Sequence, residues 1–236
     1  GKKIGLFSLE MPKTQIADRL ICLNGKINLL NWRSGHLDEK EWSRAYKSVD
    51  ALKSCQIQIE DQPGISISSL RSIARTLKTK YEVDIFLVDY LQLMKGKGGS
   101  SREQEIADIT RGLKDVAREL SVPVVACAQL SRSVEKREVK RPILSDLPES
   151  GEIENSAEVV LMLYREDYYK KPEELGQASE DSKTELIVAK QRNGPTGVVN
   201  LLFNPHFGLF RDLPSGFQQS HRETEEPVLW EDQKRG

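Results

Sequence analysis

Cysteine and net charge are both scarce in this sequence. The three cysteines, Cys22, Cys55 and Cys127, stand far apart and form no C-x-x-C pair, which argues against a disulfide scaffold or a zinc site and favours a reducing compartment. Because 35 basic and 36 acidic side chains leave a net charge of −1, the molecule as a whole has no field that would draw it onto nucleic acid or anionic lipid. Any such binding must be local.

Long apolar runs are also missing. No segment approaches the roughly 18–20 uninterrupted apolar residues of a membrane-spanning helix, and the N-terminus lacks the apolar core of a signal peptide. We therefore expect a soluble, intracellular protein without a membrane partner. The 236 residues, 38% of them apolar, are enough to bury the core of one large domain or two small ones.

Apolar strands and amphipathic helices alternate in the middle of the chain. The run at 85–88 (IFLV) is apolar at every position, as in a parallel strand buried on both faces. Residues 103–120 have the period of an amphipathic helix and lead into another apolar strand at 122–126. Strand, helix and strand in this order predict an α/β domain of three layers (αβα) with a mainly parallel sheet.

Further elements are predicted before this unit. A strand at 2–9 begins almost at the first residue, and the apolar period predicts helices at 13–23 and 38–53. A short strand at 57–60 precedes a helix that either Ser66 or Ser68 can cap.

The last third of the chain predicts a different arrangement. Residues 159–164 (VVLMLY) predict another buried strand, and the alternating runs at 185–190 and 197–203 predict an antiparallel hairpin at the edge of the sheet. Beyond it the sequence is polar and without pattern. We expect one domain at 1–213 and a disordered tail at 214–236.

Three polar side chains come directly after apolar strands: Glu10, Asp89 and Gln129. Ligands of open parallel sheets bind beyond the carboxyl ends of the strands. Asp89 could hold Mg²⁺ through its water shell, Glu10 could activate an attacking water, and Gln129 could sense a γ-phosphate. Taken singly, each has a structural alternative: a turn or helix cap for Asp89, the dipole of the next helix for Glu10, and a strand-end amide bond for Gln129.

Lys190 and Arg192 stand two residues apart after the apolar run that begins at 185. In an extended strand such residues point to the same side, so both could reach one polyanion. A neighbouring subunit can supply an arginine finger in this way. The alternative is a charged strand edge that deters pairing with other strands.

Six short motifs occur in order along the chain. They are FSLEM (7–11), LVDYLQL (87–93), REQEI (102–106), AQLSR (128–132), SDL (145–147) with ESGEIE (149–154), and KQRNGPTG (190–197). Over about residues 1–212 this series resembles the successive motifs of bacterial replicative DNA helicases of the DnaB type.

The resemblance implies a RecA-like P-loop NTPase core. It implies a homo-hexameric ring around single-stranded DNA that unwinds the duplex at the replication fork with 5′→3′ polarity, using ATP and Mg²⁺. By position, Glu10 matches the catalytic glutamate, Asp89 the Mg²⁺-linked acidic residue and Gln129 the γ-phosphate sensor. Lys190 and Arg192 match the cations that act on the neighbouring subunit's nucleotide.

The resemblance also implies DNA contacts and partners. The stretch at Glu149, Ser150 and Gly151 matches a DNA-binding loop of the central channel. The Gly/Ser-rich loop at 95–101 (KGKGGSS), with the arginine that follows it, adds further candidates for DNA contacts: Lys95, Lys97 and Arg102. The alternative is that they belong to a solvated loop that binds nothing. Primase and a helicase loader are expected partners of the full-length protein, in the bacterial cytoplasm and nucleoid or in an organelle of bacterial descent.

The sequence departs from the family pattern at two places. The loop G-x-x-x-x-G-K-[ST], which the family has on a strand and helix preceding residues 7–11, does not occur in the 236 residues. We therefore expect a truncated chain that binds nucleotide weakly and does not hydrolyse ATP alone. Pro148 stands where the family's channel loop usually has Arg, so one phosphate contact is expected to be lost or moved to a nearby cation.

Two other functions stay open on the sequence alone. A RecA-like ATPase of the recombinase or clock-protein type would share the strand-end Glu, Asp and Gln, although the runs at 145–154 and 190–197 favour the helicase. A degenerate paralogue or fragment could bind DNA or helicase subunits without turnover.

Overall fold

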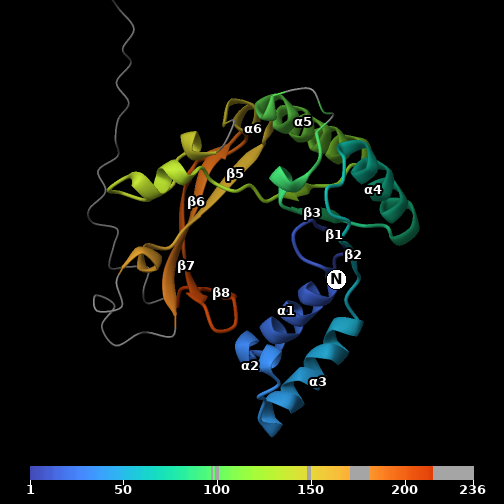
Figure 1. Cartoon of the computed structure of the whole chain (residues 1–236), viewed down its shortest axis with the longest axis vertical. Helices are drawn as coiled ribbons and strands as arrows, with labels where there is room; N and C mark the ends of the chain where they lie inside the picture. The colour runs from blue at the N-terminus through green and yellow to red at the C-terminus, as the bar shows by residue number, and fades with distance from the viewer. Residues whose placement is uncertain (97, 99–100, 148–149, 171–180, 215–236) are drawn as a thin grey trace, which may run out of the picture.

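The computed structural model describes residues 1–96, 98, 101–147, 150–170 and 181–214 (Figure 1). The expected tail, except for residue 214, lies outside the described residues, as do Lys97, Pro148 and Glu149. Among the described residues, no helix is both long enough and apolar enough to cross a bilayer.

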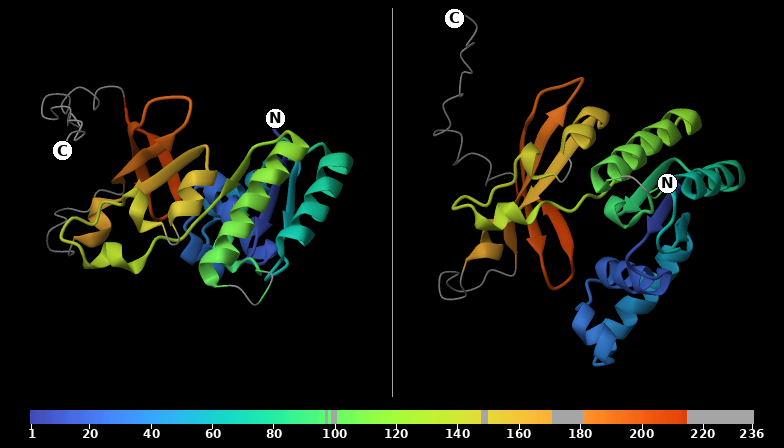
Figure 2. Two further views of the ribbon diagram at one scale, coloured as in Figure 1. Left: turned by 90° about the horizontal axis from the view of Figure 1, so that it is seen from above. Right: turned by 45° about the horizontal axis from the view of Figure 1, so that its top comes forward.

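Four parallel strands form the first sheet, in the order β2-β1-β3-β4. Their bounds are Ile4–Ser8 (β1), Ile57–Glu60 (β2), Ile85–Asp89 (β3) and Val124–Ala126 (β4). Helices α4 (Ile67–Tyr81) and α5 (Arg102–Leu120) pack on one face of this sheet (Figure 2). The predicted βαβ unit and mainly parallel sheet are confirmed.

The two faces of this sheet differ in burial. Phe86 and Val88 are each 1% exposed and pack against α4 and α5. On the opposite face Ile85 and Leu87 are only half-buried, and Val125, in register with Leu87, is 49% exposed. The expectation that 85–88 is buried on both faces is therefore wrong for one face, because α4 and α5 cover only the other.

Three helices form a small lobe beside the parallel sheet, drawn in blue in Figure 1. They are α1 (Lys13–Gly25), α2 (Leu29–Ser34) and α3 (Glu39–Lys53), around a core of Cys22, Ile27 and Ala45. The helix α2 was not expected. It begins where the Asn28 side chain accepts a hydrogen bond from the Leu30 N–H at 2.8 Å, and it ends at Gly35 in the left-handed region.

Four antiparallel strands form a second sheet, in the order β5-β6-β7-β8. Their bounds are Val159–Tyr164 (β5), Ser182–Gln191 (β6), Gly197–Asn204 (β7) and Leu209–Asp212 (β8). The predicted antiparallel pairing of β6 with β7 is confirmed. Its expected place is wrong, because the hairpin does not edge the parallel sheet but pairs with β5 and β8.

The short helix α6 (Ser150–Ser156) joins the second sheet to α5. A second core cluster holds this junction, with Ile106 of α5, Ile153 of α6 and Met162 of β5 among its buried members. Short 3₁₀ turns occupy Leu91–Leu93, Arg132–Lys136, Leu144–Asp146 and Glu166–Tyr169. The end of α6 therefore lies next to the second sheet, whose first strand, β5, begins three residues later.

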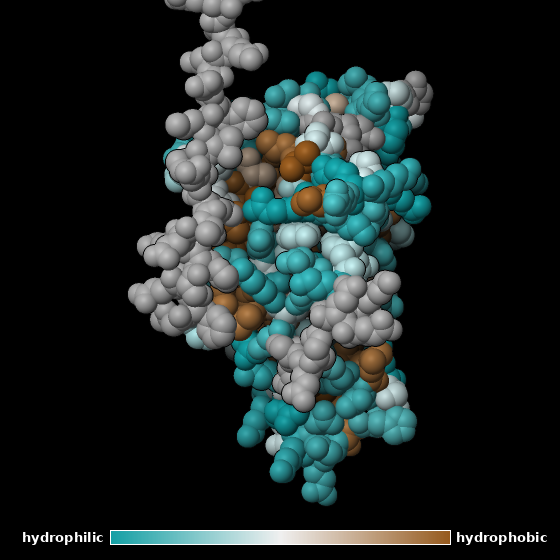
Figure 3. All heavy atoms as spheres, turned by 90° about the vertical axis from the view of Figure 1, so that its left-hand side faces the viewer, coloured by the Kyte–Doolittle hydropathy of each residue, from teal (hydrophilic) through white to brown (hydrophobic). Residues whose placement is uncertain are grey.

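One face of β5 is uncovered. Val160 and Met162 are buried, but Val159, Leu161 and Leu163 are 47%, 55% and 54% exposed. On the face of the molecule that Figure 3 shows, hydrophobic residues (brown) lie exposed between hydrophilic ones (teal). The expectation of a fully buried strand at 159–164 is therefore wrong for half of its side chains. Within the described residues, β4 and β5 each pair with one strand only, so each has an open edge.

Candidate functional site

The carboxyl ends of β1 and β3 lie side by side, which brings the turn of Glu10 to Asp89. Ser8 pairs with Asp89 in the parallel register, and the Leu9 N–H donates to the Asp89 carbonyl at 2.7 Å. The buried Ser8 hydroxyl donates to the Met11 carbonyl at 2.7 Å and closes this turn. Glu10 is exposed beyond the sheet edge, where its carboxylate can reach a water molecule or a ligand.

Asp89 ends β3 in a half-buried position, and the Asp89–Tyr90 peptide is cis. Partial burial raises the pKa of the neighbouring Cys127 thiol, and the negative charge of Asp89 raises it further. No cluster of three or more His, Cys, Asp or Glu side chains suited to a metal occurs in the described part of the chain. A single carboxylate still fits Mg²⁺, which keeps several waters and takes other ligands from substrate phosphates.

The side-chain amide of Gln92 holds the backbone of Gln129. Gln92 Nε2 donates to the Gln129 carbonyl, and Gln92 Oε1 accepts from the Gln129 N–H, each at 3.2 Å. Gln92 was not among the residues expected from the sequence. The available signal was an amide able both to donate and to accept, three residues after Asp89 in the LVDYLQL motif.

Arg102, the first residue of α5, is engaged within the chain. Its Nη2 donates to the Gln92 carbonyl, and its Nη1 lies 2.9 Å from Glu105 Oε2. The structure therefore places this predicted DNA contact at the base of the Gly/Ser-rich loop, next to Gln92.

Lys190 and Arg192 both reach the last turn of α6. Lys190 Nζ donates to the Glu154 carbonyl, and Arg192 Nη2 donates to the Asn155 carbonyl. The two cations lie on the same side of the chain, as expected from their spacing in an extended strand. The Arg192 side chain is 44% exposed, so a group from outside the chain can reach it.

Asp146, shortly before the predicted DNA contacts at 149–151, is held by several hydrogen bonds. The Asp146 carboxylate, 5% exposed, accepts from the Ile143 N–H at 2.8 Å and from Arg137 Nη2 at 2.6 Å. The Asp146 carbonyl accepts from the Ser131 N–H at 2.7 Å. These bonds tie the segment after Gln129 to the segment that leads into α6.

The predicted DNA contacts are only partly within the described residues. Ser150 and Gly151 begin α6, and Gly151 is exposed. Lys95 is exposed after the core residue Met94, and its N–H donates to the Ile65 carbonyl at 3.0 Å.

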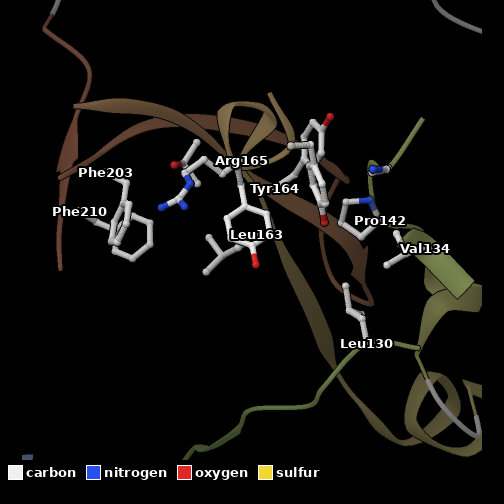
Figure 4. Close-up of a pocket in the computed structure, with 12 residues that line it drawn as sticks. Leu130, Val134, Pro142, Leu163, Tyr164, Arg165, Phe203 and Phe210 are labelled. Carbon is white, nitrogen blue, oxygen red and sulfur yellow. The ribbon is translucent and has the colours of Figure 1, made fainter. Parts of the chain in front are cut away.

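An aromatic cavity of about 260 Å³ lies between the loop after Gln129 and the second sheet (Figure 4). The Arg165 guanidinium lies over the Tyr168 ring at 5.3 Å and over the Phe203 ring at 5.0 Å. Thr184, 3% exposed, lines the cavity with a hydroxyl that has no hydrogen-bond partner among the described residues. The lining of the cavity comes from separate segments, so no local sequence pattern pointed to it.

The predicted catalytic residues fall into two groups. Glu10, Asp89 and Gln129 lie at or just beyond the carboxyl ends of strands in the parallel sheet. Lys190 and Arg192 instead lie at and just beyond the end of β6 in the antiparallel sheet. No hydrogen bond or ion pair within the described ranges joins the two groups. Within one chain the structure thus places the two groups on different sheets.

The sequence matches a known family over most of its length. Residues 1–212 match the model described as the DnaB-like helicase C terminal domain. The chain is 43% identical over 221 residues to the replicative DNA helicase DnaC of Bacillus subtilis, covering 93% of this chain and 48% of that protein. It is 42% identical over 222 residues to the replicative DNA helicase DnaB of Geobacillus stearothermophilus, with the same two coverages. The chain thus spans about half the length of the curated relatives it matches.

Solved structures agree with this match. A structure described as an ATPase domain superposes with a TM-score of 0.81 at 38% identity, over 90% of this chain and 75% of that one. A DnaB-like replicative helicase, from a structure that describes its interactions with primase, superposes with a TM-score of 0.82 at 38% identity. The match covers 90% of this chain and 51% of that one. A KaiC-like protein of Pyrococcus horikoshii superposes with a TM-score of 0.53 at 12% identity, over 91% of this chain and 76% of that one. At this identity the likeness is one of fold alone. From its motifs, its RecA-like fold and these matches, the chain belongs to the family of DnaB-like helicase C-terminal domains.

Proposed function

We propose that this chain is the motor part of an ATP-dependent replicative DNA helicase. In this proposal a homo-hexameric ring encircles single-stranded DNA at the replication fork and unwinds the duplex with 5′→3′ polarity. The observation that supports it most is the junction of β1 and β3, where the Leu9–Asp89 hydrogen bond brings the turn of Glu10 to Asp89. Family members described as replicative helicases support the same assignment.

The proposed fuel is ATP bound with Mg²⁺, which neutralises charge on the phosphates as the γ-phosphoryl group passes to water. Asp89 would hold a water of the metal's shell, and Glu10 would take the proton of the attacking water. Gln129 would contact the γ-phosphate, held in place by the amide of Gln92.

The phosphate-binding loop would come from polypeptide outside the 236 residues. Two features of the fold support this part of the proposal. β4 and β5 each have an open edge in the described part of the chain, and Val125 and Leu161 leave apolar surface uncovered beside those edges. A further strand and helix would pair with the open edges and bury that surface.

Lys190 and Arg192 would act on the nucleotide of the neighbouring subunit. The separation of these cations from Glu10 and Asp89 within one chain supports action between subunits, as does the exposure of Arg192. An arginine supplied in this way stabilises the charge of the transferring phosphoryl group.

Single-stranded DNA would pass through the channel along the loop that leads into α6, and along the Lys95–Arg102 loop. Contacts would be made mainly to phosphates, because a helicase must move along any sequence. Primase and a helicase loader would be partners of the complete protein, which would act on DNA in the bacterial cytoplasm or in an organelle of bacterial descent.

A comparison of two polypeptides tests the proposal. The chain alone should show no ATP turnover above a buffer blank, whereas the polypeptide that also includes an in-frame upstream phosphate loop should hydrolyse ATP when single-stranded DNA is added. Glu10→Gln should abolish this hydrolysis. Turnover by the chain alone that Glu10→Gln removes would mean that another loop holds the phosphates. DNA binding without turnover by the longer polypeptide would favour the non-catalytic alternative.

A further inference from the structure

Glu158 lies between α6 and β5 and contacts two cations from different elements. One carboxylate oxygen lies 2.7 Å from Lys114 Nζ on α5, and the other lies 3.5 Å from Arg192 Nε. The Glu158 carbonyl also accepts a hydrogen bond from the Arg192 N–H at 3.0 Å. Residue 192 is therefore held at both its backbone and its side chain.

The end of α6 completes this arrangement. The Asn155 carbonyl accepts from Arg192 Nη2, and the Ser156 carbonyl accepts from Lys114 Nζ at 2.9 Å. Carbonyls at the end of a helix have no partner within it and favour nearby cations. The hydrogen bond from Lys114, followed by the charge of Arg192, lowers the pKa of Glu158, so this carboxylate is ionised at neutral pH.

These contacts engage one edge of the Arg192 guanidinium. An arginine has five N–H donors in one plane. Glu158 faces Nε and the Asn155 carbonyl takes a proton of Nη2, whereas no hydrogen bond within the described residues uses Nη1. A plane fixed at one edge points its remaining donors in a defined direction, and the Arg192 side chain is 44% exposed.

We propose that Glu158 is the positioning residue of Arg192, orienting the guanidinium toward a phosphate of the neighbouring subunit, and that Lys114 fixes Glu158. This inference rests on the proposed function, in which Arg192 acts between subunits. The competing role is structural: the Lys114–Glu158 pair would only fasten α5 to the second sheet.

The test uses the complete helicase subunit with its phosphate loop and measures DNA-stimulated ATP hydrolysis. Glu158→Gln should lower kcat roughly 10-fold to 100-fold, the size expected when a reacting group is misplaced by about 1 Å, while KM for ATP stays within about twofold. Glu158→Asp should restore part of the loss. Lys114→Met should lower kcat less, and it gives a second measurement if Glu158→Gln does not assemble. Glu119→Gln is the matched control, because it also removes a carboxylate that bridges two elements, here to Arg71 and Arg75.

The double variant separates positioning from a structural role. If Glu158 acts only through Arg192, then Arg192→Ala with Glu158→Gln should have the same kcat as Arg192→Ala alone. A further loss in the double variant, or a normal kcat in Glu158→Gln, would overturn the inference. The Arg192→Ala variant is measured first. If its kcat equals that of the unchanged protein, the action between subunits is wrong and the positioning role falls with it. If the kcat of Arg192→Ala is low, action between subunits stands, and the Glu158 variants then test the positioning role by itself.

Discussion

Asp146→Ala should destabilise the fold at the base of the predicted DNA loop. The Asp146 carboxylate is 5% exposed and accepts two hydrogen bonds, from the Ile143 N–H and from the Arg137 guanidinium. A hydrogen bond to a charged group contributes about 1.5–3 kcal/mol. Because Arg137 is 34% exposed, we take the lower end of that range for each bond. The expected loss is about 3 kcal/mol, or roughly 140-fold in the unfolding equilibrium constant.

Urea denaturation followed by circular dichroism measures this loss. The matched control is Glu185→Ala, which removes another Arg–carboxylate pair, at 2.7 Å from Arg141, with side chains 41% and 27% exposed. Its loss should stay below about 1 kcal/mol, as for other solvent-exposed pairs. Equal losses in the two variants, or a loss under about 1 kcal/mol for Asp146→Ala, would refute the reasoning from burial.

Three further predictions concern turnover, pH and DNA. Arg192→Ala in the complete subunit should lower kcat roughly 10³-fold, the size expected for an arginine finger, while nucleotide binding is kept. Mixing Arg192→Ala subunits with Glu10→Gln subunits should restore some activity. No recovery at any mixing ratio would count against action between subunits. Hydrogen bonds from Arg75 and Arg71 lower the pKa of Glu119 to about 2, so the stability from this cluster should be full above about pH 4.5 and be lost as the pH falls toward 2. Glu119→Gln should therefore lower the urea midpoint at pH 6 and much less at pH 2, and an equal effect at both pH values would contradict the assignment. Pro148→Arg in a ring-forming protein should steepen the dependence of log K for single-stranded DNA on log[salt] by about 0.7, one phosphate contact; superimposable salt titrations would show that position 148 does not face DNA.

Local pattern was enough to predict several elements to the residue. The strands at Ile57–Glu60 and Val159–Tyr164 have the bounds that their apolar runs indicate, and Ser66 rather than Ser68 caps α4. The helix α2 was missed because six residues are too few to establish a helical period.

Pairing between distant segments was not predictable. The run at 159–164 could equally be a parallel strand buried on both faces or a strand with one uncovered face, because an apolar run does not reveal its neighbours. In the structure it pairs antiparallel with β6, and this long-range pairing creates the second sheet.

The candidate site shows the same limit. Glu10, Asp89 and Gln129 could be selected because polar residues directly after apolar strands are a local signal. Gln92 and Glu158 could not be selected in this way, since their place depends on bonds to Gln129 and to Arg192 and Lys114, which lie far away along the chain.

The shortness of α6 has a thermodynamic consequence. Seven residues at 1.5 Å each make a helix of about 10 Å, with the predicted DNA loop at its start and the carbonyls that hold Lys190 and Arg192 at its end. A shift of this helix changes the surroundings of both ends together. If DNA bound at the start alters nucleotide affinity through α6, linkage requires nucleotide to alter DNA affinity by the same factor. Measuring the two affinities, each with and without the other ligand, would give one coupling free energy between DNA and nucleotide from two independent routes.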